Sequence, residues 1–232
     1  SNALSRHDAI LQSYTTDLST QNYSNAARWE LVTALVDVLL NSRSTQAISS
    51  VVVAASVAVG AGGKAGVGVS IGASIARNLI GYEWDYSTAP AEVRAYVENS
   101  SINATGDLIQ SALASQTINS AVIAASVGIG GAGKVGVGVS GSGVYSENWI
   151  GVDVESSING DGATGIHVND ITLTASDTST ISALAGAASI AASFAGEVGV
   201  SVSIGVSLAQ NTISSGVQSF IKNADQVVTS GN

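Results

Sequence analysis

The stretch Gly66-Val67-Gly68-Val69-Ser70-Ile71-Gly72-Ala73-Ser74-Ile75-Ala76-Arg77-Asn78 decides the fold, because versions of it recur along the chain. It returns as Gly136-Val137-Gly138-Val139-Ser140, closed by Asn148, and as Gly199-Val200-Ser201-Val202-Ser203, closed by Asn211. The closing asparagines Asn78, Asn148 and Asn211 are 70 and 63 residues apart. A fixed internal period predicts stacked units, each of which buries its apolar surface against a neighbour.

The composition favours closely spaced sheets. Charged residues make up 11% of the 232 residues, less than half of the usual value of about 25%. There are 26 glycines and one proline, and the apolar residues are mainly Ala, Val and Ile. The formal charge of −9, with no cluster of Lys or Arg, argues against a nucleic-acid partner. The absence of cysteine excludes disulfides and thiolate metal sites.

The first 45 residues differ from the rest. Ser1-Asn2-Ala3 resembles the remnant of an expression tag, so the natural sequence is expected to be a piece of a longer chain. Apolar residues with helical spacing predict an α-helix over Ala26–Leu40. Residues 4–45 are therefore interpreted as a helical insertion in a degenerate first unit, or as a cap on a sheet edge.

From residue 46 onward, the apolar period changes to two. Val57 and Val59 alternate with small residues, and the alternation resumes in the same phase at Val67, after the turn Gly62-Gly63-Lys64. Val59 is expected to face Val67 across this turn, so each unit is predicted to be a long Gly/Ser/Val hairpin. The Gly, Ser and Ala side indicates close sheet packing, and both sides are expected to be covered.

These patterns predict a mainly β fold, an elongated solenoid-like array of three repeats of about 63 residues with one N-terminal α-helix. The array covers 46–232, with units at about 46–115, 116–178 and 179–232. The extra length of the first unit is assigned to Gly81–Pro90. A right-handed parallel β-helix with about three coils per repeat is the alternative.

Two apparent catalytic motifs fail on their context. Gly128–Lys134 resembles a phosphate-binding loop, but Val135 follows the lysine and the flanking segments are predicted strands. Gly68–Gly72 matches the nucleophile-elbow pattern of hydrolases, but its serine lies in mid-strand. We therefore expect no enzymatic activity.

Four residues are candidate Ca²⁺ ligands: Asn159, Asp161, Asn169 and Asp170, around the loop Gly160–Gly165. Their spacing matches neither an EF-hand nor a calcium-binding nonapeptide repeat. Asx-Gly pairs are also typical of turns, so a structural role is the alternative. No other cofactor is expected.

Tyr82, Trp84 and Tyr86 form a candidate ligand-contact loop. Aromatic side chains stack on sugar rings, but they can equally cover a sheet edge. Asn78, Asn148 and Asn211 are interpreted differently, as a ladder of stacked amides in which each side chain satisfies the next.

Residues 46–232 resemble the repeats of very large secreted bacterial surface proteins, namely filamentous, haemagglutinin-like adhesins and leukotoxin-type relatives. The resemblance rests on the Gly-Val-Gly-Val-Ser-Ile-Gly pattern and on Asn78-Leu79-Ile80, Asn148-Trp149-Ile150 and Asn211-Thr212-Ile213. It implies an extracellular location on the bacterial cell surface. No active-site residues are implied.

The function expected is that of a non-enzymatic stalk, or of a surface presented to the host or to glycans, with neighbouring repeats of the same chain as partners. The alternative is a membrane-inserting or pore-forming, toxin-like hairpin module, because its strands would also carry one aliphatic side. Only this alternative makes the membrane a partner. The sequence leaves the oligomeric state open.

Overall fold

The computed structural model describes residues 37–231, which are mainly β with parallel sheets. Within this range there is no helix, and hence none long and apolar enough to cross a membrane. The strands are β1 (Val38–Ser44), β2 (Ala47–Gly62), β3 (Ala65–Ile80), β4 (Ala91–Glu98), β5 (Ile102–Asn103), β6 (Leu108–Ala114), β7 (Thr117–Ala132), β8 (Val135–Asn159), β9 (Ile166–Val168), β10 (Ile171–Asp177), β11 (Thr180–Ala195), β12 (Val198–Lys222) and β13 (Val227–Thr229).

Most of the helix expected over Ala26–Leu40 lies outside the described residues. Its last three residues are not helical, because Val38–Leu40 begin β1, which pairs with β6 in parallel. Val38 and Leu40 both pack against the buried residues of the structure. The helix prediction is therefore wrong at this end, where pairing with the equivalent strand overrides the helical spacing.

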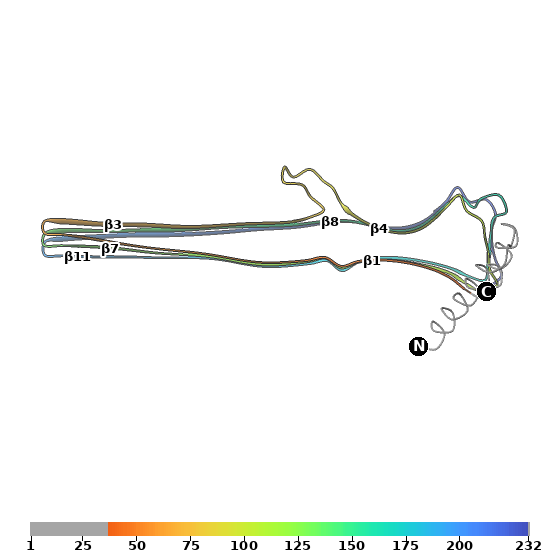
Figure 1. Ribbon diagram of the computed structural model, residues 1–232, viewed down its shortest axis with the longest axis horizontal. Coiled ribbons are helices and arrows are strands. Elements are labelled where there is room, and N and C mark those ends of the chain that lie inside the picture. The colour runs from red at the N-terminus through yellow and green to blue at the C-terminus, as the bar shows by residue number, and fades with distance from the viewer. Residues whose placement is uncertain (1–36, 232) are drawn as a thin grey trace, which may run out of the picture.

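Each repeat forms one coil of the chain. In the middle coil, β6 and β7 run outward, the chain turns at Gly133-Lys134, β8 returns, and β9 leads into the next coil (Figure 1). The long strands form two sheets, β2-β7-β11 and β3-β8-β12, by parallel pairing of equivalent residues 70 or 63 positions apart. The structure is therefore a β-solenoid in which one repeat makes one coil.

The predicted hairpins are wrong. β2 and β3 follow one another around the turn, but they belong to different sheets, and Val59 and Val67 each pair with their counterparts in the next coil. The parallel alternative is right in its pairing and wrong in placing about three coils in each repeat. Strand alternation is the same for both arrangements, so the backbone hydrogen bonds could not be assigned from it.

The two long sheets face each other in the part of the molecule that we call the arm, residues 47–76, 117–146 and 180–209. Over most of the arm their facing sides carry Gly, Ser and Ala, because the sheets approach too closely for larger side chains. Valines such as Val122 and Val144 enter only near the base. A Cβ atom on Gly68 would lie 2.0 Å from the carbonyl oxygen of Ile129, and one on Gly138 would lie 2.1 Å from that of Ala192. Real Cβ atoms do not approach other atoms so closely.

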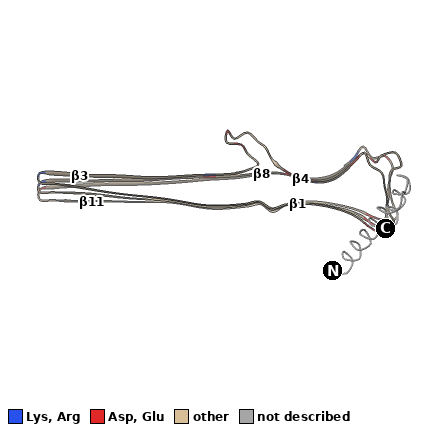
Figure 2. Cartoon of the chain, in the orientation of Figure 1, with Lys and Arg blue, Asp and Glu red and all other residues tan. Residues whose placement is uncertain are grey.

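The aliphatic side of the arm faces outward and is not covered by other described residues. Val57, Ile71 and Ile204 are 71%, 74% and 60% exposed. The expectation that both sides are covered is therefore wrong for the larger side chains. The arm strands carry no charge between the turns at one end and Arg77 and Glu147 at the other (Figure 2).

The remaining described residues form the base, in which the pattern is reversed. β8 keeps one phase over its whole length, but its inward positions change from Gly136 and Ser140 in the arm to Ile150 and Val154 in the base. Ile150 and Val154 belong to an aliphatic cluster that is closed to solvent. The base therefore has an ordinary hydrophobic core, whereas the arm buries only a small aliphatic cluster around Val122 and Val144, close to the base.

The loop Gly81–Pro90 rises from the outer side of the β3-β8-β12 sheet where the arm meets the base (Figure 1). Ile80 pairs with Ile150 and Ala91 pairs with Val152, so ten residues stand opposite Gly151 alone. The solenoid accommodates this insertion without a change in the inward phase of β4.

Candidate functional site

The junction between arm and base holds a buried ion pair. The 70-residue offset brings Arg77 of β3 beside Glu147 of β8, and Arg77 Nε donates to Glu147 Oε2 at 2.8 Å. The glutamate side chain is 2% exposed and that of the arginine 27% exposed. A carboxylate closed to water needs such a partner, so the pair ties the first coil to the second.

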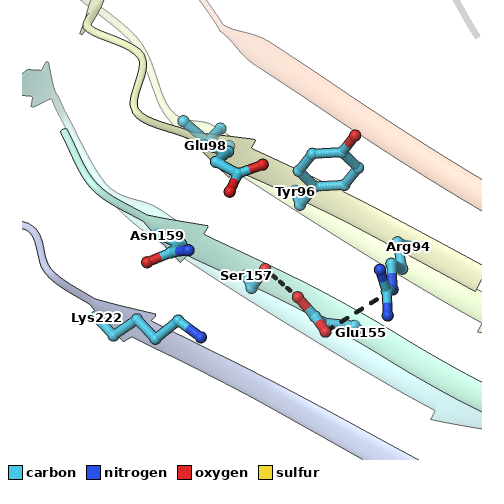
Figure 3. Close-up of a pocket in the computed structure, with 8 residues that line it drawn as sticks. Arg94, Tyr96, Glu98, Glu155, Ser157, Asn159 and Lys222 are labelled. Atoms are coloured by element: carbon cyan, nitrogen blue, oxygen red, sulfur yellow. Dashed lines mark hydrogen bonds and ion pairs between the residues drawn. The ribbon is translucent and has the colours of Figure 1, made fainter. Parts of the chain in front are cut away.

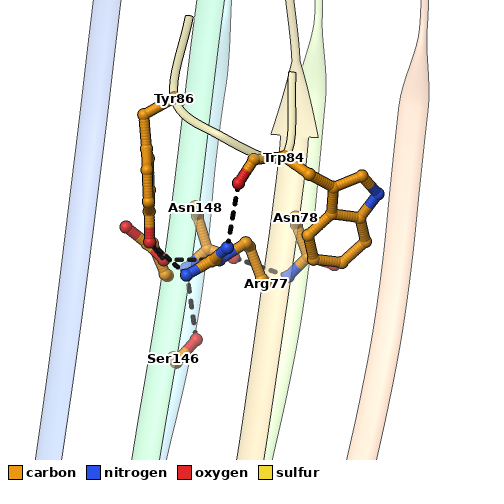
Figure 4. Close-up of polar contacts among 7 residues, drawn as sticks. Arg77, Asn78, Trp84, Tyr86, Ser146 and Asn148 are labelled. Atoms are coloured by element: carbon orange, nitrogen blue, oxygen red, sulfur yellow. Dashed lines mark hydrogen bonds and ion pairs between the residues drawn. The ribbon is translucent and has the colours of Figure 1, made fainter. Parts of the chain in front are cut away.

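The projecting loop folds over this ion pair (Figure 4). Arg77 donates to the backbone oxygen of Trp84 at 3.3 Å and to the hydroxyl of Tyr86. That hydroxyl donates in turn to Glu147 at 2.9 Å. Tyr86 has a φ of 67°, in the left-handed region, stabilised next to a turn in which Ser87 donates twice to Asp85. The same hydrogen bonds lower the pKa of Asp85.

The three loop aromatics have different roles. Tyr82 packs edge-on against Trp149 of β8 with ring centroids 5.1 Å apart, and Tyr86 packs on the same indole at 5.0 Å. Partial burial, together with the hydrogen bond to Glu147, raises the pKa of Tyr86. Trp84 is 73% exposed and lies with its ring 5.5 Å from the Arg77 guanidinium carbon. Of the three, Trp84 is therefore the side chain open to a ligand.

The three asparagines that close the repeated stretch lie in one column inside the solenoid. Asn78 Nδ2 donates to Asn148 Oδ1 at 2.7 Å, and Asn148 Nδ2 donates to Asn211 Oδ1 at 2.8 Å. Asn148, in the middle coil, is fully buried. Asn78 and Asn148 lie close to Arg77, which is on the opposite, outward side of the sheet (Figure 4). Polar contacts therefore join the coils on both sides of the sheet.

All four candidate Ca²⁺ ligands are hydrogen-bonded within the protein, three of them to residues about one repeat away in the sequence. Asn159 accepts a hydrogen bond from Asn223 at 2.8 Å, and Asp161 accepts one from the backbone of Gln226. Asn169 donates to Asp107 at 2.8 Å and more weakly to Asp170 at 3.4 Å. Within residues 37–231, no group of three or more His, Asp or Glu side chains is arranged to hold a metal ion.

A recess lies on the outer side of the base (Figure 3). Its volume is about 290 Å³, and charged residues of both signs line it. Arg94 lies 3.9 Å from Glu155, which also accepts hydrogen bonds from Ser157 and from Gln218. The lining residues are Arg94, Tyr96, Val97, Glu98, Glu155, Ser157, Asn159 and Lys222.

Neither of the two motifs that resemble catalytic sequences has the geometry that the corresponding site requires. Ser70, in the motif that matches a nucleophile elbow, is 4% exposed and hydrogen-bonded to Ser56 and Ser126 between the sheets. Gly128–Lys134 spans the end of β7 and the turn to β8, with no helix to receive a phosphate. The described residues do present an exposed indole, that of Trp84, and a recess lined by charges of both signs.

Sequence reasoning missed Arg77, Glu147 and Trp149, although the 70-residue offset that aligns the asparagines also aligns these residues. It could not have found Arg94 with Glu155, because the insertion changes their offset to 61. Comparison of the chain with protein-family models, with curated proteins and with solved structures found no match.

Proposed function

We propose that this chain is a non-enzymatic structural segment of a large secreted bacterial surface protein, and that it presents a broad surface for contact with the host or with glycans. The observation that carries the proposal is the pairing of equivalent residues coil on coil, over the full length of β8 and β12. Such an array can be lengthened by further coils, since each coil needs only its nearest neighbours.

The dimensions favour a presenting surface over a stalk. A 25-residue strand such as β8 is about 80 Å long, whereas each coil advances the array by only about 4.8 Å. A repeat of 63 residues therefore makes the array wide along its strands but lengthens it only slightly along the axis on which the coils stack. Loops such as Gly81–Pro90 stand out from this wide surface at fixed positions.

Trp84 is the proposed contact residue, because it is exposed and held above a charged pair. The test is a screen for binding to glycans and host-cell surfaces, comparing the wild-type chain with Trp84→Ala. The control is Phe194→Ala, which removes a side chain 66% exposed at the far end of the arm. Loss of binding in Trp84→Ala alone supports the adhesive role; binding that survives this substitution overturns the assignment to Trp84.

The structural role is tested separately by repeating residues 107–169, one full coil, in tandem. We expect higher thermal stability and unchanged circular dichroism per residue, because a coil adds one more parallel interface. A tandem chain that is less stable than the parent would contradict the proposal of an extendable array.

The uncharged arm also favours a second candidate, insertion into a membrane. The outward aliphatic run Ala65–Ile75 is about 36 Å long, close to the thickness of a hydrocarbon layer, about 30 Å. Within residues 37–231, however, β2, β3, β11 and β12 each pair on one side only. Burying roughly 10 unpaired backbone groups in each edge strand, at several kcal/mol each, would cost more than 100 kcal/mol.

The apolar side chains cannot offset that cost. About 20 exposed aliphatic side chains in the arm would contribute roughly 30–60 kcal/mol on transfer. We therefore expect the three coils by themselves to remain in water, where their edge strands are hydrated. Leakage of dye from liposomes on addition of this chain would reverse this conclusion.

A further inference from the structure

The outward side of the β3-β8-β12 sheet in the arm has no role in the structural segment proposed above. We call it the aliphatic face, formed by outward side chains of Ala65–Ile75, Val135–Tyr145 and Val198–Leu208. It is about 36 Å long and about 14 Å wide over three coils, roughly 500 Å² before side-chain relief. That area is near the upper end of what a monomer exposes in one patch.

We propose that this face binds the same face of a second copy of the chain, with the strands of the two copies antiparallel. Association of two copies leaves the edge strands in water, which insertion into a bilayer would not. The face also has relief to seat a partner: positions 141 and 143 are glycines with open space around them, and Ile71 and Ile204 stand on either side of Gly141.

The distribution of charge determines the orientation. The arm ends at turns that carry Lys64 and Lys134, and the projecting loop at the other end of the face carries Glu83 and Asp85. The loop lies over Arg77 on this same side of the sheet. An antiparallel arrangement brings each lysine-bearing turn toward the acidic loop of the other copy. A parallel arrangement would place one acidic loop beside the other.

Lys134 is already paired with Glu197 at 3.1 Å, but both side chains are about 60% exposed. Such exposed pairs contribute little, so Lys134 can be shared. The opposite side of the arm, formed by β2, β7 and β11, is also aliphatic, with Val57 71% exposed. The same lysine-bearing turns end this side of the arm. Among the described residues, no projecting loop and no acidic residue stands at its other end, where the outward residues are Ser49, Asn119 and Ser182, so charge does not select a partner orientation there.

The area of the aliphatic face limits how tightly two copies can bind. Two aliphatic faces together bury roughly 1,000 Å², at the lower limit of stable interfaces. We therefore expect weak, concentration-dependent dimers of the three-coil chain. Each added coil extends the face by about 170 Å² per copy, so the chain with residues 107–169 in tandem dimerises more tightly.

Sedimentation velocity over a wide range of protein concentration tests the proposal. Ile71→Glu is expected to weaken dimerisation at least tenfold, because it places carboxylates in an apolar contact. The matched control is Val57→Glu, an equally exposed position on the opposite side of the arm, which leaves dimerisation unchanged. Circular dichroism establishes that both variants are folded.

Charge reversal tests the orientation. Lys64→Glu is expected to weaken the dimer, and Lys64→Glu combined with Glu83→Lys is expected to restore it. Failure of this rescue overturns the antiparallel arrangement. A chain that stays monomeric at every concentration, loss of dimers only in Val57→Glu, or flotation of monomers with liposomes overturns the proposal as a whole. None of these results affects the tandem-coil test of the structural role.

Discussion

The arm and the base are continuous along the same strands, yet they are stabilised in opposite ways. In the base, large aliphatic side chains such as Ile150 point inward and charged residues such as Glu155 point outward. Over most of the arm, small residues point inward and valine and isoleucine point outward, and inward valines such as Val144 appear only near the base. The difference shows that sheet separation, and not hydrophobicity alone, decides which side of a strand is the interior.

The largest expected effect breaks the close approach of the two sheets in the arm. In Gly138→Val, the new Cβ atom would lie 2.1 Å from the backbone oxygen of Ala192 in the facing sheet. We therefore expect the free energy of unfolding to fall by more than about 3 kcal/mol. Gly141→Val, three residues further on, points into open space and is expected to change stability by less than about 0.5 kcal/mol. Urea unfolding of both variants measures the contrast. Equal losses would mean that the sheets of the arm are not in close contact.

The next effect is on the core of the base. Ile150→Ala empties a fully buried position and is expected to cost about 2–4 kcal/mol. Ile71→Ala removes the same kind of side chain from a position that is 74% exposed, so a monomer should lose less than about 1 kcal/mol. Thermal unfolding at low protein concentration gives both values. A larger loss of stability in Ile71→Ala than in Ile150→Ala would mean that the hydrophobic core lies in the arm and not in the base.

A smaller effect tests the asparagine column at the boundary between the two regions. Asn148→Ala leaves the amides of Asn78 and Asn211 without their partner in the middle coil, at a cost of about 2 kcal/mol. Asn119→Ala, on the exposed side of β7 in the same coil, is the control and should be nearly neutral. Chemical denaturation measures the stability of both variants. An unchanged stability in Asn148→Ala would mean that the asparagine column does not stabilise the fold.

The smallest effect is the response of the loop to pH. The pKa of Tyr86 is raised above its ordinary value of 10.0, because its protonated hydroxyl donates to Glu147 in a partly buried site. The stabilisation is therefore complete below pH 10 and is lost as the pH rises through the folded-state pKa. The stability advantage of the wild type over Tyr86→Phe should shrink in strongly alkaline solution. An advantage that is constant with pH would exclude this hydrogen bond as its source.

The sequence predicted the period and the alternation, and hence a mainly β repeat array. It also placed Asn78, Asn148 and Asn211 at one lateral position, where the structure has them. It could not distinguish pairing within a repeat from pairing between repeats, because both satisfy the same alternation around Gly63. The consequence was a hairpin prediction in which Val59 and Val67 lie beside each other.

Other features of the site depend on tertiary structure that no local pattern encodes. Close packing on the Gly, Ser and Ala side of the arm was expected and is present, but the aliphatic side was wrongly expected to be covered as well. The recess near Arg94 and Glu155 depends on the ten-residue insertion opposite Gly151, which shifts the alignment of one coil against the next. The indole of Trp149 packs against Tyr82 and Tyr86 only because the projecting loop folds back onto it.

The register of the coils has a mechanical consequence. About fifty residues of the third coil pair with the second, all with their hydrogen bonds along the array axis. A tensile load applied evenly along that axis must break these bonds together, whereas a load on one chain end peels them one at a time. The same molecule would thus be stiff when pulled through its whole width and easily unravelled from a terminus.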